Sequence, residues 1–450
     1  MEWTNNKYFT VIANVCRFIL SLVLVLSGFV KAVDPVGSMY KLREYVQAFS
    51  VNGLTDDWLL FIAIMQAVLE FMLGICLLMG VYRKVVAFAA PLVTLFFTVL
   101  TMIIYFAGNI QDCGCFGDAI AMTNGETLAK NIFLLVLSLA VMLGRRRFVY
   151  NISSKSRWMV TLFALAYIAL AETLSLSHLP VVDFSSYPVG MNLREATKGI
   201  PDEYRVMYIY ELNGDTCEFA QNEQPDSAWT CVGSRYEVVK KGIKPEVADF
   251  SIVDWEWDCD ISDKIISDSG YVCLVAIELV ETASVSRVDK INDLYDHCLE
   301  KNIAFYVATG SDDDNIELWR KRTGAEYPMY WMDEAVIRNM IRSNPGVLLL
   351  KDGIIIGKWN VADMPAVEEL ADSSARVPDS FRTHVDWMRG WQFWMILLAA
   401  PLLFIIVLDV IVCRVSKKNP TDEAVKEGVP AQGAETAELK ETNTEELKDK

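Results

Sequence analysis

The chain has 450 residues, of which 53% are hydrophobic, and 58 acidic side chains outnumber 41 basic ones. A net charge of −17 and only three histidines argue against nucleic-acid binding, because no basic surface offsets the acidic one. Such a high apolar content beside so many charges predicts that the apolar residues are gathered into membrane-spanning segments.

Six apolar runs of about 18 residues or more are long enough to cross a bilayer as helices. They occupy residues 11–33, 58–80, 85–107, 127–144, 157–177 and 391–413. The first run is expected to stay in the protein, because no small-residue cleavage site follows it and further spans come after it.

Lysine and arginine gather in alternate loops, which predicts that those loops face the cytoplasm. These residues are Arg83, Lys84, Arg145, Arg146, Arg147, Lys155, Arg157, Arg414, Lys417 and Lys418. The segment QDCGCFGDAIAMTNGET (111–127) carries none, whereas the first loop, with Lys31, Lys41 and Arg43, departs from the pattern. We therefore expect an inner-membrane protein with both termini in the cytoplasm. The soluble stretch between the last two spans then faces the periplasm, where disulfides form.

Two charged residues lie within the predicted spans, Arg17 in NVCRFIL and Glu70 in AVLEFMLG. A rise of 1.5 Å per residue places them within about 6 Å of the same depth. An unpaired charge at that depth is costly, so the sequence favours an Arg17–Glu70 ion pair. In the alternative, Arg17 extends to the inner surface while Glu70 is protonated or bonds a hydroxyl group.

The loop QDCGCFGD (111–118) holds Cys113 and Cys115, two thiols one residue apart. They are candidate catalytic residues if they cycle between dithiol and disulfide, although Asp112 and Asp118 should raise the thiol pKa values. The alternatives are a structural pair in a tight turn or part of a metal site. No further metal ligand lies nearby in the sequence, so no metal is expected.

Three segments carry a resemblance: SGFVKAVDPVGS (27–38), LEFMLGICLLMG (69–80) and DCGCFGD (112–118). Together they resemble the DoxX/MauE group of four-helix membrane proteins, over about residues 8–148. DoxX-like proteins are linked to quinone-coupled oxidation of sulfur compounds, and MauE-like proteins to maturation of a disulfide-rich periplasmic enzyme. The resemblance therefore implies thiol or electron-transfer chemistry, with a membrane quinone as the cofactor it suggests.

Alternating runs in the front of the soluble stretch, MYIYELNG and WTCVGSRYEVV, predict β-hairpins. Cys217 and Cys231 lie in neighbouring runs. If those runs pair directly, the two sulfurs face each other and form a disulfide; otherwise they are two half-buried thiols.

The rest of the soluble stretch alternates strands and helices and ends in GVLLLKDGIIIGKW, whose Lys-Asp-Gly predicts a hairpin. This order predicts an α/β domain with a mixed sheet. It resembles the thioredoxin superfamily, in which Pro345 would be the cis-proline before a strand.

The thioredoxin pattern is incomplete, because its redox Cys-x-x-Cys position here reads ELVETAS. Glu281 and Thr282 stand there, and hydroxyl groups cannot replace thiolates in disulfide exchange. Glu281, Thr282 and Pro345 are therefore candidates for binding an extended partner chain rather than for catalysis.

The predicted organisation is a six-helix membrane protein with an α/β periplasmic domain. It comprises a four-helix DoxX/MauE-like domain (1–150), a fifth span (151–178), β-hairpins (179–265), a thioredoxin-like domain without Cys-x-x-Cys (266–388), a sixth span (389–415) and a disordered cytoplasmic tail (416–450). Two functions compete: a thiol-disulfide or quinone-linked oxidoreductase acting on periplasmic protein thiols, and a non-catalytic module that holds an envelope client.

Overall fold

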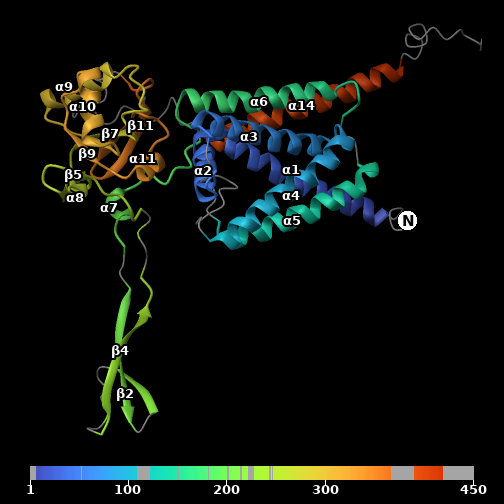
Figure 1. The fold of residues 1–450 in the computed structure, drawn as a ribbon. Coiled ribbons are helices and arrows are strands. Elements are labelled where there is room, and N and C mark those ends of the chain that lie inside the picture. The colour runs from blue at the N-terminus through green and yellow to red at the C-terminus, as the bar shows by residue number, and fades with distance from the viewer. Residues whose placement is uncertain are drawn as a thin grey trace, which may run out of the picture.

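The computed structural model describes residues 7–51, 53–108, 122–148, 152–180, 182–199, 202–212, 215–220, 225, 228–242, 245, 247–365 and 390–418. The long helices are α1 (Lys7–Val33), α3 (Asp56–Met79), α4 (Arg83–Ala107), α5 (Asn124–Gly144), α6 (Arg157–Ser177) and α14 (Trp391–Lys418). All six are long and apolar enough to span a membrane, so the six predicted spans are confirmed. Figure 1 shows them running side by side, with the α/β domain at one end of the bundle and the N-terminus at the other.

Helix α1 lies at the centre of the bundle and packs against α3 and α5. Two glycines let the backbones of α1 and α3 approach closely. A Cβ on Gly28 would lie 2.5 Å from the Phe71 backbone nitrogen, and a Cβ on Gly74 would lie 2.7 Å from the Val25 nitrogen. Small residues at a helix crossing are a common means of tight packing in membranes.

Helices α6 and α14 attach to this bundle through an aromatic cluster. The Tyr167 ring of α6 lies 5.5 Å from the Phe71 ring of α3 and 5.9 Å from the Trp394 ring of α14. The Tyr167 hydroxyl also donates a hydrogen bond to the Trp394 carbonyl oxygen at 2.8 Å. Helices α6 and α14, which precede and follow the soluble part of the chain, are thus packed against the same helical bundle.

The α/β domain is built on a seven-stranded sheet of order β11-β10-β7-β8-β9-β5-β6. Its strands are β5 (Val253–Asp254), β6 (Cys259–Asp260), β7 (Tyr271–Ile277), β8 (Ala304–Thr309), β9 (Met329–Trp331), β10 (Gly346–Lys351) and β11 (Ile354–Asn360). Strands β7, β8 and β9 are parallel, whereas β10 runs antiparallel to both β7 and β11. The predicted mixed sheet is therefore present.

Helices cover both faces of this sheet. They are α7 (Leu193–Ala196), α8 (Ser262–Ser267) and α11 (Glu334–Met340) on one face, and α9 (Asp289–Lys301) and α10 (Asp313–Thr323) on the other. Strand β7 is buried on both sides, which explains its unbroken apolar sequence. The β10–β11 turn places Asp352 at φ +51° and Gly353 at φ +73°, the geometry of a two-residue type I′ hairpin.

A second sheet, which we call the arm, contains β2 (Glu203–Leu212), β3 (Asp215–Ala220) and β4 (Thr230–Lys240) in the order β3-β2-β4. Figure 1 shows the arm extending away from the α/β domain. Cys217 on β3 and Cys231 on β4 both lie opposite Tyr210 of the central strand.

The predicted Cys217–Cys231 disulfide is therefore wrong, and both thiols are free and exposed. Two strand spacings place their Cα atoms about 10 Å apart. A disulfide needs a separation below about 7 Å. The expectation failed because the two runs each pair with β2 and not with each other.

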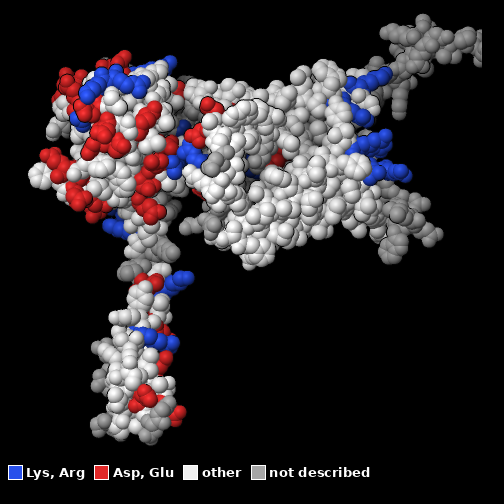
Figure 2. Space-filling view, viewed as in Figure 1, with Lys and Arg blue, Asp and Glu red and all other residues white. Residues whose placement is uncertain are grey.

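Charge is distributed unevenly along the molecule (Figure 2). The middle of the helical bundle is nearly free of charged side chains, and the α/β domain carries many acidic ones. Basic residues gather at the bundle end farthest from that domain, where α4 and α6 begin and α5 ends; they include Arg83, Lys84, Arg145, Arg146 and Arg157.

The close α1–α3 contact predicts that Gly28→Ala and Gly74→Ala each lower the melting temperature of the detergent-solubilised protein. Overpacking costs roughly 1–3 kcal/mol, which exceeds the gain of about 1 kcal/mol in helix propensity from replacing glycine by alanine. Gly125→Ala is the matched control, because its Cβ would meet only Tyr105 at 3.6 Å. An unchanged melting temperature for both crossing variants would contradict this packing.

Candidate functional site

A buried ion pair joins α1 to α3 inside the bundle. The Lys31 ammonium group lies 2.7 Å and 2.8 Å from the two Glu70 carboxylate oxygens and donates to Ser27 Oγ at 2.9 Å. Ser27 Oγ and Gln66 Nε2 also donate to Glu70, at 2.6 Å and 3.1 Å. Glu70 is only 2% exposed. A lone carboxylate would be costly at that depth, but this one is paired with the Lys31 ammonium group and hydrogen-bonded.

The predicted Arg17–Glu70 pair is therefore wrong. Helical side chains lean toward the N-terminus of their own helix. Lys31 in α1 and Glu70 in antiparallel α3 consequently lean toward each other. The close approaches of Gly28 to Phe71 and of Gly74 to Val25 place Glu70 level with about residue 28 of α1, so Arg17 lies roughly 16 Å farther along the helix. The Arg17 guanidinium instead lies over the Phe148 ring at 5.1 Å. Depths counted from the predicted ends of the spans gave the wrong register between the two helices, and Lys31 was assigned to the first loop.

A cavity of about 640 Å³ adjoins the ion pair; we call it the α1–α5 cavity. Its lining comes from α1 to α5 and is mostly apolar. Ser27, Lys31, Gln66, Glu70, Thr94, Thr101 and Asn131 are among its polar lining residues. This volume falls within the range of ordinary ligand pockets.

Helices α4 and α5 contribute hydroxyl and amide groups to the same region. Asn131 Nδ2 donates to Thr101 Oγ1 at 2.6 Å, and Thr94 and Ser138 hydroxyls lie 2.9 Å apart. These buried hydrogen bonds join α4 to α5 and add to the apolar packing between the two helices.

Cys113 and Cys115 lie outside the described residues, so the structure says nothing of their contacts. The helices on either side of that loop are described: α4 is followed by Gly108, and α5 is capped by Thr123, whose side chain forms a capping box with Glu126. The segment that contains both cysteines thus connects the two helices that carry Thr101 and Asn131.

A short helix, α2 (Pro35–Ala48), lies over the cavity. Asp34 caps it by accepting from the Gly37 nitrogen at 2.8 Å, and Pro35 occupies its first turn. A Cβ on Gly37 would lie 2.3 Å from Asp34 Oδ2, so this cap needs glycine. Helix α2 was not expected from the sequence, although Asp-Pro is a helix-start signal.

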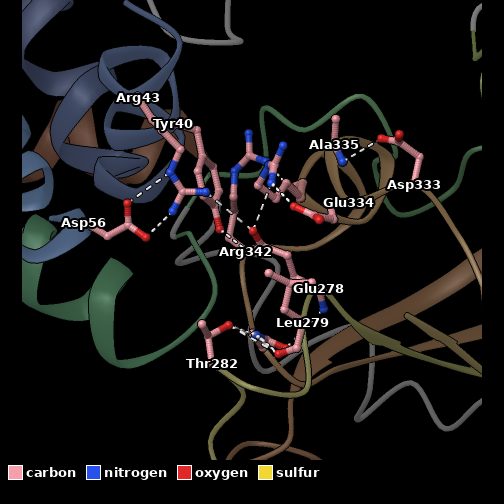
Figure 3. Close-up of polar contacts among 12 residues, drawn as sticks. Tyr40, Arg43, Asp56, Glu278, Leu279, Thr282, Asp333, Glu334, Ala335 and Arg342 are labelled. Atoms are coloured by element: carbon pink, nitrogen blue, oxygen red, sulfur yellow. Dashed lines mark hydrogen bonds and ion pairs between the residues drawn. The ribbon is translucent and has the colours of Figure 1, made fainter. Parts of the chain in front are cut away.

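Helix α2 and its N-cap also contact the α/β domain, at a cluster that we call the junction: Asp34, Tyr40, Arg43, Glu278, Arg338 and Arg342. Figure 3 shows Tyr40, Arg43, Glu278 and Arg342 of this cluster. Glu278, at the end of β7, accepts from the Tyr40 hydroxyl at 2.8 Å and from Arg338 Nη1 at 3.0 Å. Arg43 Nη1 lies 3.7 Å from Glu278, and Arg342 Nε donates to Asp34 at 3.0 Å. The guanidinium groups of Arg43 and Arg338 each lie 5.2 Å from the centre of the Tyr40 ring.

Junction burial shifts two pKa values outside the membrane-spanning helices. Burial first, and then the neighbouring Glu278 carboxylate, raise the pKa of Tyr40, so its hydroxyl remains a hydrogen-bond donor at neutral pH. Burial alone would lower the pKa of Arg338, but its hydrogen bond and attraction to Glu278 outweigh this and raise it. Tyr40 therefore stays neutral and Arg338 stays charged at neutral pH.

Pro345 and Thr282 are brought together beside the junction. The Asn344–Pro345 peptide bond is cis. The Asn344 side chain donates to the Leu279 carbonyl oxygen at 3.1 Å and to Thr282 Oγ1 at 3.2 Å, and the Asn344 carbonyl accepts from the Ser284 nitrogen at 3.1 Å. Asn344 thus fills the space at the end of β7 with internal hydrogen bonds.

Glu281 points elsewhere, accepting from Ser311 Oγ at 2.6 Å and Asn315 Nδ2 at 2.5 Å. Its carboxylate fixes the β8–α10 connection. A hydrogen bond with Cys298, and then burial, raise the pKa of Cys273 well above its ordinary value, so this core thiol is a poor nucleophile. Among the described residues, no group of three or more histidine, cysteine or acidic side chains could hold a metal ion.

Comparison with protein families matches residues 9–144 to the family described as methylamine utilisation protein MauE. Residues 9–144 form a MauE-family domain. It contains α1 to α5, and therefore the Lys31–Glu70 pair, the α1–α5 cavity and the segment with Cys113 and Cys115. No curated protein and no solved structure matches the chain.

The MauE-family domain thus contains four of the six candidate membrane spans, while α6, α14, the α/β domain and the arm lie outside the match. Lys31 and Asn131 were missed by sequence reasoning. A lysine four residues after a serine in an apolar run is the signal that could have identified Lys31 as an intramembrane residue.

The ion pair predicts strong coupling between positions 31 and 70. Lys31→Met or Glu70→Gln alone should cost roughly 3–5 kcal/mol of stability, because each change leaves a buried polar group without its matched partner. The double variant should cost clearly less than the sum, measured by thermal unfolding in detergent. Arg17→Met with Glu70→Gln is the control, and its effects should add. Coupling of position 17 but not of position 31 would contradict the assignment.

The junction predicts that Glu278→Gln loosens α2, since a charge-assisted hydrogen bond contributes about 1.5–3 kcal/mol. Hydrogen exchange measured by mass spectrometry should accelerate roughly tenfold or more in peptides covering α2. Glu334→Gln is the matched control: Glu334 bonds the same Arg338 at 3.2 Å but is exposed. Equal exchange in the Glu278→Gln variant and the unchanged protein would show that the junction does not hold α2.

Proposed function

We propose that this protein is an inner-membrane thiol oxidoreductase in which Cys113 and Cys115 form the redox pair. Its MauE-family domain carries the reaction, and both termini lie in the cytoplasm with the α/β domain and the arm in the periplasm. The basic residues at the bundle end opposite the α/β domain support this orientation.

The observation that carries the proposal is the position of the cysteine-bearing segment. It connects α4 and α5, whose Thr101 and Asn131 line a cavity that adjoins a buried ion pair. A redox pair in the segment that joins these two helices would pass electrons to a carrier dissolved in the bilayer.

The proposed reaction balances with a membrane quinone as the oxidant. Oxidation of the Cys113 and Cys115 thiols forms one S–S bond and releases two electrons and two protons. The quinone takes up both electrons and two protons and becomes a quinol. A periplasmic dithiol then attacks the Cys113–Cys115 disulfide, leaves as a disulfide and returns the pair to thiols.

The α/β domain is proposed to be thioredoxin-like and to bind a partner without exchanging disulfides itself. The strand order β11-β10-β7-β8, with β7 and β8 parallel and β10 antiparallel to β7 and β11, supports this proposal. The β7–α9 connection, all of whose residues are described, contains no cysteine; Glu281 and Thr282 lie in it. Pro345 and Thr282 remain the proposed partner-binding residues.

A second function is a non-catalytic module that holds an envelope client. Asn344 favours it. Its side chain bonds Leu279 and Thr282 at the end of β7, and so occupies the place where a thioredoxin would bring a disulfide to react. In that case the junction would present the α/β domain to the client in a fixed orientation.

The test is the redox state of Cys113 and Cys115 in cells, measured by alkylation and mass spectrometry. We expect both states in growing cells and a shift to the dithiol when cellular quinone is depleted. Cys113→Ser/Cys115→Ser should abolish the oxidation of periplasmic thiols, whereas the Cys217→Ser control should not.

The oxidoreductase proposal would be wrong if Cys113 and Cys115 stayed in a single redox state and the double-serine variant behaved as the unchanged protein. A client that still co-purifies with this variant would then support the holding function.

A further inference from the structure

The arm has a long strand edge that can accept another strand. Among the described strands, β4 pairs with β2 alone, and every β4 residue except Gly233 is exposed to solvent. The N–H and C=O groups along such an edge form a template for a further strand. The opposite edge, β3, is shorter, and its exposed Asp215 and Glu218 make it acidic. Strand β4 is therefore the edge at which the arm is best suited to extend.

The two faces of the arm differ in chemistry at the middle of β4. Tyr236 lies on one face, with its ring centre 6.4 Å from that of Tyr204 on β2. Arg235 and Glu237 lie on the other face, and both are exposed. The pairing of β4 with β2 is regular from Gly233 to Val238 and shifts only outside that run. The edge is thus undistorted where these side chains lie.

The charges of β4 are complementary to those of a second copy of the same strand. In a two-fold antiparallel pair, one residue lies opposite its own copy, because facing residues point to the same side of the sheet. With Tyr236 in that position, Arg235 of each copy lies opposite Glu237 of the other. A pair centred on Arg235 or on Glu237 would instead place like charges opposite each other, which is unfavourable. The charges therefore select the register centred on Tyr236.

Arg235 can form this contact without leaving its present partner. Its Nη2 atom lies 2.8 Å from a Glu218 carboxylate oxygen in its own arm. A guanidinium group has five N–H donors, so it can bond a second carboxylate at the same time.

The direction of the arm allows two copies to pair within one membrane. Figure 1 shows the arm crossing the direction of the long helices, so its strands run along the membrane plane. A two-fold axis perpendicular to the membrane then places two arms antiparallel while both helical bundles keep the same orientation. The paired sheet lies parallel to the membrane surface in that arrangement.

We propose that two copies of this chain associate through β4, in the antiparallel register centred on Tyr236. Three strands from each copy then form one continuous sheet of order β3-β2-β4-β4-β2-β3. The second copy supplies an opposite charge for Arg235 and for Glu237, and it extends the row of Tyr204 and Tyr236 rings across the interface. Neither the α1–α5 cavity nor the proposed redox pair takes part, so this proposal and the proposed function fail separately.

The first test uses sedimentation velocity of full-length charge variants in detergent. Arg235→Glu and Glu237→Arg should each raise the dimer dissociation constant at least tenfold, because either change places like charges opposite each other in both cross-strand pairs. An equimolar mixture of the two variants should recover dimers within about threefold of the unchanged protein, since every facing pair is again Glu with Arg. A mixture that stays monomeric, or variants that dimerise alone as the unchanged protein does, would overturn the register.

The second test is disulfide cross-linking of the full-length protein in lipid vesicles. It uses a background in which the exposed cysteines of the described chain and the two of the 111–118 segment are serine: Cys113, Cys115, Cys217, Cys231 and Cys259. Tyr236→Cys should form a disulfide-linked dimer under mild oxidation, because facing residues of antiparallel strands have Cα atoms about 4.5–5.5 Å apart.

Val238→Cys is the matched control, on the same strand and face and 48% exposed. Val238 would face Ser234 of the second copy, so the two cysteines at 238 would lie about 14 Å apart along the strands and stay unlinked. Equal cross-linking at 236 and 238 would overturn the register. A protein that remains monomeric and unlinked at both positions would overturn the pairing itself.

Discussion

The contact between Lys31 and Glu70 constrains the rest of the membrane domain. Two opposite charges lie inside a bundle whose surface faces hydrocarbon, so they must remain together. Their meeting requires α1 and α3 to be antiparallel and in close contact, which Gly28 and Gly74 permit. The same pair leaves polar groups along one wall of the bundle and so prevents complete apolar packing there. The α1–α5 cavity lies where that packing stops.

The second constraint is the shared use of α2. Ser38, Lys41 and Tyr45 on this helix line the cavity, whereas Tyr40 and Arg43 contact Glu278 of the α/β domain. The MauE-family domain and the α/β domain are therefore joined by side chains as well as by the chain itself. Burial of Tyr40 between two guanidinium groups makes the junction a specific contact and not a loose association.

Local sequence patterns predicted most of the secondary structure. Long apolar runs identified the six spans, and the apolar strand YVCLVAI and the Lys-Asp-Gly turn identified β7 and the β10–β11 hairpin. The failures concern pairs distant in sequence. Glu70 meets Lys31 because the close packing at Gly28 and Gly74 sets the register of α1 against α3, and Cys217 is separated from Cys231 because β2 lies between their strands. Neither fact is contained in the spacing of residues. The contacts of Cys113 and Cys115 lie outside the described part of the chain, so their role stays a prediction.

The α1–α5 cavity opens between α3 and α4, where its lining residues Phe61 and Phe96 are each about half exposed or more, and this opening has a topological consequence. The cavity lining runs from Phe61 and Leu100, in the half of the bundle nearer the α/β domain, to Leu69 and Leu92 near the middle of the same helices. A molecule diffusing in the leaflet on that side meets the opening directly. One that resides in the opposite leaflet must first cross the bilayer midplane. The cavity is therefore more accessible from the leaflet on the side of the α/β domain than from the other leaflet.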